Sequence, residues 1–525
     1  MRIAISFPPL ESKKGIPLLS QNRQFQWFNE PTYIYPMVPS YAASLLKSKG
    51  YEVLWDDGIA QKMSYKQWQE RIIKEKPDII AIETKTPVVE QHWKIIDELK
   101  NKLPNSKVTL MGDHITAFPE ESLQKSKVDY AITGGDYDFM LLNLANHLSK
   151  GEDLEGGFWY KDCHPRQSHC NPRQSHCHPR QPHCHPRQQS GDPATTNTGP
   201  NDLSKHDLNT LPLIDRQLTH WEDYSINNGN FKYTPGSYMM SGRDCWWGKC
   251  TFCSWTTLFP GNKFRTMSAK KALDEVENLI KLGVKEIMED SGSLPIGKWL
   301  DEFCRGMIDR GYNKKITMSC NMRINGIKKI ETWKLMKEAG FRFILFGLES
   351  ANQETLDKIN KGLKIEEIEP GLKICKEAGL EPHITGMIGY PWESKADAQR
   401  TIDLAKNLFK KGYVDTLQAT IVIPYPGTPL YTYCDENDLL TTHDYTHFDQ
   451  REQVMKSNLT TEDVQEMVQG LYKSFITPKF ILRKIGSIRS WDDIKFFWMA
   501  GKKVLGHLTD FSKKEKKCEN CNKSD

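Results

Sequence analysis

The first 162 residues of this 525-residue chain contain no cysteine, although the whole chain has 13. No run of 18 apolar residues occurs, so no transmembrane segment is expected. The net charge is only +4, without the concentrated positive face that nucleic-acid binding requires. The opening stretch MRIAISFPPL is too short for a secretion signal and is typical of a strand. We therefore expect a cytoplasmic protein whose cysteines serve metal chemistry rather than disulfides.

Residues 1–150 alternate strand-like and helix-like segments. The strand-like stretches include RIAISF (2–7), PDIIAIET (77–84) and KVTLMGD (107–113), with helical patterns between them. This alternation predicts an α/β domain with a doubly wound, Rossmann-like parallel sheet, whose ligands bind at the carboxyl ends of the strands. No G-x-G-x-x-G segment follows the first strand, so a dinucleotide ligand is not expected.

Residues 163–189 repeat one heptapeptide four times, with Cys163, Cys170, Cys177 and Cys184 at intervals of seven. A proline in every unit prevents a regular helix, so residues 151–205 are expected to form a disordered low-complexity insertion followed by a plain linker. Tracts rich in Cys and His also bind metals, which leaves that role open. Residues 206–235 would connect this segment to a second domain.

Strand and helix patterns alternate again over residues 236–440. About six βα units follow one another, which predicts a complete or partial TIM-type barrel with its active site at the carboxyl ends of the strands. Residues 441–525 have a mainly helical pattern and end in a Lys-rich tail that contains Cys518 and Cys521. The segment IKFFWMAGKKVLGHL (494–508) is apolar and basic; we expect a core helix there, with contact to a membrane surface as the alternative.

Three cysteines lie within nine residues, in CWWGKCTFC, directly after the first strand of the predicted barrel. Cys245, Cys250 and Cys253 would therefore lie at the mouth, where barrel active sites form. Three thiolates on a four-iron cluster leave one iron open for a small chelating ligand. Structural zinc sites use four protein ligands, so a zinc site would need a histidine from elsewhere in the chain.

With its strand–loop–helix context, the segment from Ser241 to Trp255 resembles the radical S-adenosylmethionine (SAM) enzymes, whose usual spacing is C-x3-C-x2-C. Here four residues separate the first two cysteines. The resemblance extends to five further strand ends: MEDSG, NMR, FGLES with a following NKG, GMIGYPWE and PYPGTPLY. It implies a 4Fe–4S cluster on the three cysteines. The SAM contacts that it implies are Glu289, Asp290 and Ser291 for the amino group, Arg323 for the carboxylate, Glu349 for the ribose or amine, and Gly386 and Gly389 beside the adenine.

The order of these motifs is most similar to the radical SAM subgroup with an N-terminal cobalamin-binding domain. VTLMGDHITAFPEE and VDYAITGGDYD resemble the stretches of that domain usually written GG-x-H and GEGE. The resemblance implies cobalamin contacts at Gly112, His114, Gly134 and Gly135. Asp113 stands where a second glycine is usual in the first stretch. The D-x-H-x-x-G motif that supplies a histidine to cobalt is absent, so that ligand is not expected.

The resemblance implies reductive cleavage of SAM to methionine and a 5′-deoxyadenosyl radical, which removes hydrogen from an unactivated carbon. With cobalamin the substrate would be methylated, whereas some relatives cyclise or rearrange theirs. The implied partners are an electron donor such as flavodoxin or ferredoxin and an unknown small-molecule or lipid-like substrate. Two alternatives stay open: a radical SAM enzyme without cobalamin, and a non-catalytic Cys/His metal-binding protein. A methylthiotransferase is not favoured, because its second cluster needs cysteines in the N-terminal domain.

Overall fold

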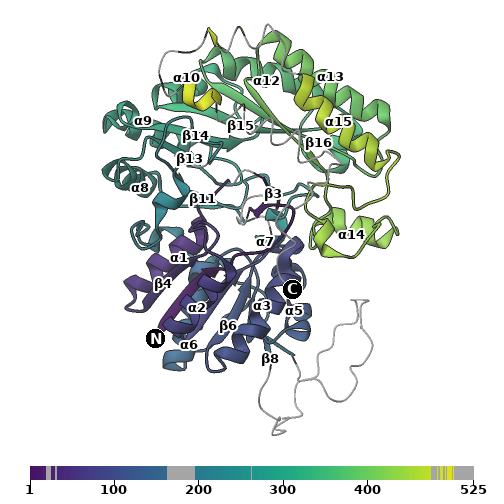
Figure 1. Ribbon diagram of the computed structural model, residues 1–525. Coiled ribbons are helices and arrows are strands. Elements are labelled where there is room, and N and C mark those ends of the chain that lie inside the picture. Colours follow the sequence, from purple (N-terminus) through teal and green to yellow (C-terminus); the bar gives the residue numbers. More distant parts are fainter. Residues whose placement is uncertain are drawn as a thin grey trace, which may run out of the picture.

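In a computed structural model of the chain, two α/β domains face each other (Figure 1). The structure describes residues 1–18, 25–29, 32–161, 195–226, 228–259, 261, 263–474, 482, 485, 486, 488, 491, 493–498 and 501. The heptapeptide repeat and the two cysteines of the tail lie outside these residues, so the predictions for them stay predictions. Within the described part of the chain, none of the helices is long and apolar enough to cross a membrane.

The N-terminal domain is built on a seven-stranded sheet in the order β4-β1-β5-β6-β7-β8-β9. The first five strands in that order are parallel, and β8 and β9 are antiparallel. The strands are β1 (Arg2–Phe7), β4 (Glu52–Asp57), β5 (Ile79–Glu83), β6 (Lys107–Met111), β7 (Tyr130–Ile132), β8 (Phe158–Lys161) and β9 (Thr195–Asn197). Every residue of β5 is buried, as expected for a parallel strand covered on both faces.

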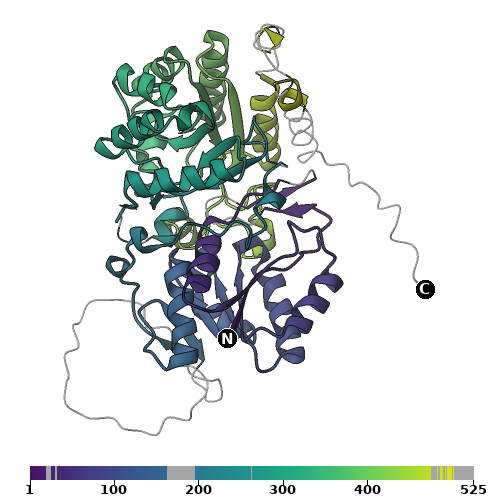
Figure 2. The ribbon, with the colours of Figure 1, turned by 90° about the vertical axis from the view of Figure 1, so that its left-hand side faces the viewer.

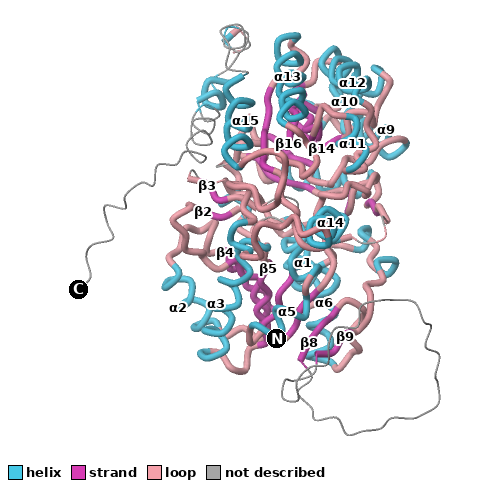
Figure 3. Tube along the Cα trace, turned by 90° about the vertical axis from the view of Figure 1, so that its right-hand side faces the viewer, coloured by secondary structure: helices cyan, strands magenta, loops and turns pink. Residues whose placement is uncertain are grey.

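Helices cover both faces of this sheet. Figure 3 shows α2 and α3 on one side and α1 and α6 on the other. A capping box formed by Ser64 and Gln67 begins α2, and Gly151 ends α6 in the left-handed conformation. The predicted Rossmann-like parallel sheet is therefore confirmed. The helices are α1 (Met37–Ser48), α2 (Tyr65–Glu75), α3 (Val89–Lys102), α4 (Asp113–Ala117), α5 (Pro119–Lys125) and α6 (Tyr137–Lys150).

Strands β8 and β9 depart from the expectation of a plain linker after the repeat. Thr195–Asn197 pairs with Trp159–Lys161 and extends the sheet beyond β7. Three residues are too few to show the alternating pattern from which a strand is predicted. The partner strand also precedes β9 by the whole repeat, so no local hairpin signal links the two.

The second domain has a parallel six-stranded sheet in the order β10-β13-β14-β15-β16-β17, which confirms the predicted partial TIM-type barrel. Its strands are β10 (Gly236–Met239), β13 (Glu286–Glu289), β14 (Thr317–Met322), β15 (Phe341–Glu349), β16 (Glu381–Ile388) and β17 (Thr416–Ile421). The outer helices are α8 (Ala269–Lys281), α9 (Lys298–Asp309), α10 (Ile330–Glu338), α11 (Gln353–Lys358), α12 (Ile365–Glu377) and α13 (Lys395–Lys411).

The remaining elements are short strands, further α-helices and 3₁₀ turns. The strands among them are β2 (Ile16–Pro17), β3 (Trp27–Phe28), β11 (Gly242–Arg243) and β12 (Arg265–Thr266). The α-helices are α7 (Trp255–Leu258), α14 (Pro429–Glu436) and α15 (Thr461–Ser474). The 3₁₀ turns are η1 (Thr86–Val88), η2 (Leu203–Lys205), η3 (Leu208–Thr210), η4 (Trp221–Tyr224), η5 (Tyr312–Lys314) and η6 (Tyr445–His447).

The carboxyl ends of the N-terminal strands meet the mouth of the partial barrel. α4, which follows β6, contacts α7, and η1, which follows β5, contacts η6. Figure 2 shows the same junction from the side, with the N-terminal domain below and the partial barrel above. The two edges at which ligands of such sheets bind therefore face one another.

The expectation of a core helix over residues 494–508 is wrong for its described residues. Residues 493–498 are helical, but Ile494 is exposed and Trp498 is 68% exposed. Hydrophobicity alone predicted burial here, and it does not report whether another element covers the helix.

Candidate functional site

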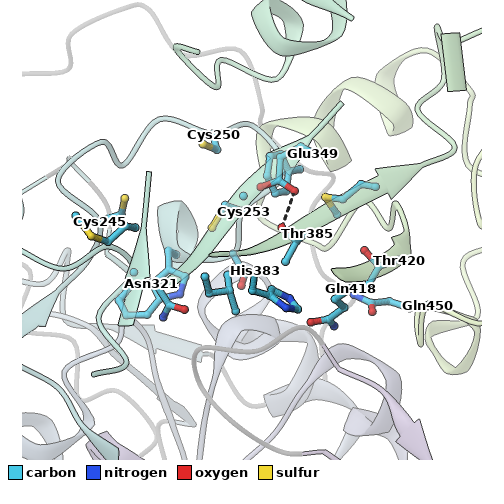
Figure 4. Close-up of a pocket in the computed structure, with 18 of the residues that line it drawn as sticks. Cys245, Cys250, Cys253, Asn321, Glu349, His383, Thr385, Gln418, Thr420 and Gln450 are labelled. Atoms are coloured by element: carbon cyan, nitrogen blue, oxygen red, sulfur yellow. Dashed lines mark hydrogen bonds between the residues drawn. The ribbon is translucent and has the colours of Figure 1, made fainter. Parts of the chain in front are cut away.

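A loop that carries the three cysteines, residues 244–264, projects at the barrel mouth; we call it the cysteine loop. Strands β11 and β12 close its base. Cys245, Cys250 and Cys253 are free, partly buried thiols that line a cavity of about 450 Å³ (Figure 4). In the part of the chain that the structure describes, no three His, Cys, Asp or Glu side chains converge to hold one metal ion. Three cysteine thiols on one loop are the type of ligand that holds an iron–sulfur cluster.

Two glycines make room for the cysteine loop, Gly292 after β13 and Gly362 after α11. A Cβ atom on Gly292 would lie 3.1 Å from the Cβ of Cys245, and one on Gly362 would lie 2.2 Å from the ring of Trp247. The guanidinium of Arg323 lies 4.4 Å from the ring centroid of Trp247, within cation–π range. The loop is therefore packed against the ends of several strands.

A buried ion pair stands in the same wall. Lys361 Nζ lies 2.8 Å from Glu349 Oε1, and a Cβ atom on Gly347 would lie 2.1 Å from that carboxylate oxygen. Glu349 adopts the left-handed conformation, with φ of 63°, where the pairing of β15 with β16 is irregular. Such strain in a non-glycine residue persists where the surroundings hold the side chain in place, which is common at functional sites.

Two buried cations lie close to the thiol of Cys250. Burial raises the pKa of Cys250, and Lys361 and Arg323 oppose that rise. Burial lowers the pKa of Lys361, but Glu349 and Cys250 together outweigh this effect, so that the net shift is upward. Burial lowers the pKa of Arg323, and the neighbouring cysteines oppose the fall. The two cations thus favour negative charge at this wall, as thiolates and an iron–sulfur cluster require.

The structure divides the residues expected to contact SAM into two groups. Ser291, Arg323 and Glu349 line the cavity with the cysteines. Glu289 lies behind the wall, where its Oε1 accepts hydrogen bonds from the backbone N–H and hydroxyl of Ser241, each at 2.8 Å. The buried Asp290 also lies behind the wall, and its N–H donates to the carbonyl of Met239 at 2.8 Å. Glu289 therefore fixes the turn from β10 into the cysteine loop.

Gly386 and Gly389 do not line the cavity. A Cβ atom on Gly386 would face Leu471 of α15 at 3.9 Å, and one on Gly389 would face Val464 of the same helix at 3.5 Å. Thr385 lies beside Gly386 in β16 and does line the cavity, because alternate residues of a strand point to opposite faces. Neutral polar side chains of the strands also line the cavity, and that alternation would have identified them: Asn321, His383, Thr385, Gln418 and Thr420 (Figure 4).

The residues expected to contact cobalamin lie at the carboxyl edge of the N-terminal sheet. Gly112 has φ of 135°, and a Cβ atom there would lie 2.1 Å from the carbonyl oxygen of Thr84. Gly134 has φ of 81°, and Gly135 follows it before α6. His114 is buried, with its ring nitrogens 3.3 Å from Thr86 Oγ1 and 3.3 Å from Glu121 Oε2. The histidine is thus held by side chains of its own edge.

Two further charged residues at this edge, Lys85 and Glu83, were not expected from the sequence. Lys85 is buried and lies 3.1 Å from Asp113, the residue that stands in place of the usual glycine. Glu83 ends β5, and both of its carboxylate oxygens are buried without a hydrogen-bond partner among the described residues. Burial raises the pKa of Glu83 to about 7, although Lys85 opposes the rise. An unpaired buried acceptor beside a glycine-lined edge fits cobalamin, whose rim carries amide N–H donors.

A network of buried charges joins the cysteine loop to the N-terminal domain. Arg243, two residues before Cys245, donates to Asp136 Oδ1 and Asp138 Oδ1, each at 2.8 Å. Arg265 and His206 hold the other oxygen of Asp136, at 2.8 and 2.7 Å. Arg243 and Arg265 are cross-strand partners, so Asp136 offsets the repulsion between them. In the sequence, the GGDYD stretch was interpreted only as a variant of a glycine motif. The structure shows that Asp136 and Asp138 of this stretch bind Arg243 and so connect the two domains.

Comparison with known protein families gives two matches. The model of the radical SAM superfamily matches residues 239–405, and the model of the B12 binding domain matches residues 31–139. The first covers the cysteine loop and the strands around the cavity. The second covers the sheet edge with Gly112 and Gly134. Both matches agree with the resemblance found in the sequence.

Similar proteins cover nearly the whole chain. An uncharacterized methyltransferase of Pyrococcus horikoshii is 27% identical over 86% of this chain and 90% of its own. The anaerobic magnesium-protoporphyrin IX monomethyl ester cyclase of Cereibacter sphaeroides is 24% identical over 85% of this chain and 67% of its own. The radical SAM methyltransferase TsrM of Kitasatospora setae, solved with cobalamin and a 4Fe–4S cluster, aligns with a TM-score of 0.66. It is 13% identical and covers 97% of this chain and 99% of its own, so it shows a shared fold.

Proposed function

Because the chain carries a radical SAM domain joined to a B12-binding domain, whose cofactors are a 4Fe–4S cluster, SAM and cobalamin, we propose that it methylates an unactivated carbon of its substrate. One observation carries this proposal: a single cavity is lined by both domains. The three cysteines form one part of its wall, and Leu18, Phe28 and Ile34 of the N-terminal part of the chain form another. When bound, the cluster with SAM supplies a radical and cobalamin supplies the methyl group.

The residues of this chain would hold, orient and shield the reactants. The three thiolates bind the cluster. Ser291, Arg323 and Glu349 bind the polar end of SAM, since all three line the cavity beside the cysteines. Arg323 keeps Nε buried and without a hydrogen-bond partner among the described residues, while its Nη2 donates to the backbone of Gly362 at 3.1 Å. The guanidinium is thus held in place, and its Nε–H is left to donate a hydrogen bond to a carboxylate.

Anaerobic product analysis tests the proposal. The full chain, reconstituted with iron and sulfide, is incubated with dithionite, SAM and cobalamin. We expect 5′-deoxyadenosine from radical formation and S-adenosylhomocysteine from methyl transfer. Cys250→Ala should lose the cluster and both products, whereas Cys375→Ala, a buried cysteine in α12, should keep them. A colourless, zinc-loaded protein without deoxyadenosine would refute the proposal and restore the metal-binding alternative.

Omission of cobalamin separates the remaining alternatives. If S-adenosylhomocysteine requires cobalamin, the cobalamin-dependent reaction is supported; a radical SAM enzyme without cobalamin would form only deoxyadenosine, with or without it. A flavodoxin or ferredoxin in place of dithionite tests the proposed electron donor. These readouts do not depend on knowing the substrate.

Cyclisation is a second candidate reaction, because a cyclase is similar to this chain over 85% of its length. SAM with a deuterated methyl group distinguishes it from methylation in an extract of small molecules. A product that gains the labelled methyl group supports methylation. A product that loses hydrogen without gaining label supports cyclisation.

A further inference from the structure

The C-terminal part of the chain carries an unusual concentration of exposed hydrophobic side chains. Within the described residues, nine large hydrophobic side chains are strongly exposed, and five of them lie between residues 482 and 498: Leu482, Ile485, Trp491, Ile494 and Trp498. Trp491 is 84% exposed and Trp498 is 68% exposed. Single exposed hydrophobic residues are normal on soluble proteins, but a gathered set with two tryptophans marks an interaction surface.

The helical residues 493–498 have two different faces. Asp493 is buried and lies 2.5 Å from Lys232, and Phe496 lies 6.0 Å from the guanidinium of Arg342. These contacts attach the inner face to the barrel. Trp491, Ile494 and Trp498 have helical spacing and lie on the exposed face. One face of this short helix therefore packs against the barrel, while the opposite face is exposed to solvent.

This segment also concentrates positive charge. Residues 479–503 contain seven Lys or Arg and two Asp, although the whole chain carries a net charge of only +4. One of the two acids, Asp493, is paired with Lys232, while Lys495 is exposed beside the hydrophobic residues. Exposed Trp and Ile next to Lys form the composition that inserts into the headgroup region of an anionic membrane.

The location of this surface agrees with membrane contact. Lys232 precedes β10, and Arg342 lies near the beginning of β15, so the segment covers the amino-terminal end of the barrel strands. The cysteines and the cavity lie at the opposite, carboxyl-terminal ends. Contact at this surface would therefore leave the junction of the two domains open to ligands.

We propose that the exposed side chains of Leu482, Ile485, Trp491, Ile494, Lys495 and Trp498 bind the surface of a membrane rich in anionic phospholipid. A second copy of the chain is the rival occupant. It is less favoured because residues 479–503 carry more positive than negative charge in the sequence, so that two copies would repel each other there, whereas an anionic bilayer attracts Lys495 and accommodates the tryptophans. The proposal does not depend on the reaction that the enzyme catalyses.

Vesicle co-sedimentation of the full chain tests this proposal. The vesicles are phosphatidylcholine with or without phosphatidylglycerol. We expect binding only with phosphatidylglycerol, weakened by added salt, and a fall of about tenfold or more in the double variant Trp491→Ser/Trp498→Ser. The matched control is Leu213→Ser/Ile226→Ser, which removes two exposed hydrophobic residues elsewhere and should bind like the wild type.

Three results would overturn the proposal. The first is no binding to anionic vesicles, and the second is equal binding by both double variants. The third is a concentration-dependent dimer, seen by analytical ultracentrifugation, that only the tryptophan variant dissociates. That result would assign the surface to contact between copies. Circular dichroism of both variants verifies that each is folded.

Discussion

The guanidinium of Arg243 binds the carboxylate of Asp138 through both of its terminal nitrogens, inside the junction of the two domains. Both side chains are almost fully buried. Arg243 ends β11, directly before the cysteine loop, and Asp138 lies in the first turn of α6. This ion pair thus fixes the position of the cysteine loop relative to the sheet edge that is proposed to bind cobalamin.

Arg243→Met should destabilise the protein strongly. It leaves Asp138 buried without its cation, and breaking a buried pair in this way costs about 3–5 kcal/mol. Arg305→Met is the matched control, because Arg305 pairs with Asp301 on the exposed surface of α9, where losing an ion pair should leave the stability nearly unchanged. Urea unfolding measures both. Similar losses of unfolding free energy in the two variants would show that the Arg243–Asp138 pair contributes no more to stability than a surface ion pair.

His206 should make the stability depend on pH. Burial lowers the pKa of His206, but hydrogen bonds to Asp136 and Glu155 outweigh this and raise it to about 9. The folded state thus binds the proton more tightly than the unfolded state, whose pKa is about 6.5. The stabilisation is complete below pH 6.5 and is lost as the pH rises through 9. It amounts to about 3 kcal/mol at most.

Thermal unfolding between pH 6.5 and 9.5 measures this effect. The melting temperature of the wild type should fall more steeply with pH than that of His206→Gln. His443→Gln, at an exposed position, should follow the wild type. Parallel curves for the wild type and His206→Gln would contradict the assignment of the proton to His206.

Glu83→Gln should stabilise the cofactor-free protein at high pH. Burial raises the pKa of Glu83 to about 7. Between pH 4.5 and pH 7 the Glu83 carboxyl loses its proton in the unfolded state but keeps it in the folded state. The contribution of Glu83 to the free energy of unfolding therefore falls over this range and stays constant above pH 7. The variant should match the wild type near pH 4.5 and be more stable by about 1–3 kcal/mol at pH 8. A less stable variant at pH 8 would reveal a partner for this carboxylate.

Lys361→Met should weaken SAM binding. The change leaves Glu349 without the cation that holds it at the cavity wall. We expect the dissociation constant for SAM to rise about tenfold or more, equivalent to about 1.4 kcal/mol. Anaerobic calorimetry measures it, and Lys373→Met, on the exposed surface of α12, is the control. Unchanged affinity with an intact cluster would remove Glu349 from the binding site.

The sequence was sufficient to predict the features that repeat locally. Alternating strands and helices predicted both sheets, and the position of Cys245 after β10 predicted its place at the barrel mouth. Contacts between distant residues were not predictable in this way. Arg243 and Asp136 lie far apart in the chain, and no local pattern pairs them.

The candidate site shows the same limit. The NKG stretch after FGLES was recognised, but only the structure shows Lys361 beside Glu349. Glu289 was expected at the ligand and instead supports Ser241, since a strand-end motif does not reveal which side chain faces inward. The alternation along β16 would have separated Thr385 from Gly386.

The pairing of Lys161 with Thr195 bears on how many heptapeptide units the chain can carry. These residues hold the two ends of the heptapeptide tract together, and 33 residues lie between them. The entropy lost when two positions of the unfolded chain are brought together grows only with the logarithm of the number of residues between them, so one more unit of seven would cost about 0.2 kcal/mol. Gain or loss of whole units during DNA replication would leave the rest of the molecule unchanged. Variants that differ by whole repeat units are therefore expected to fold as this chain does.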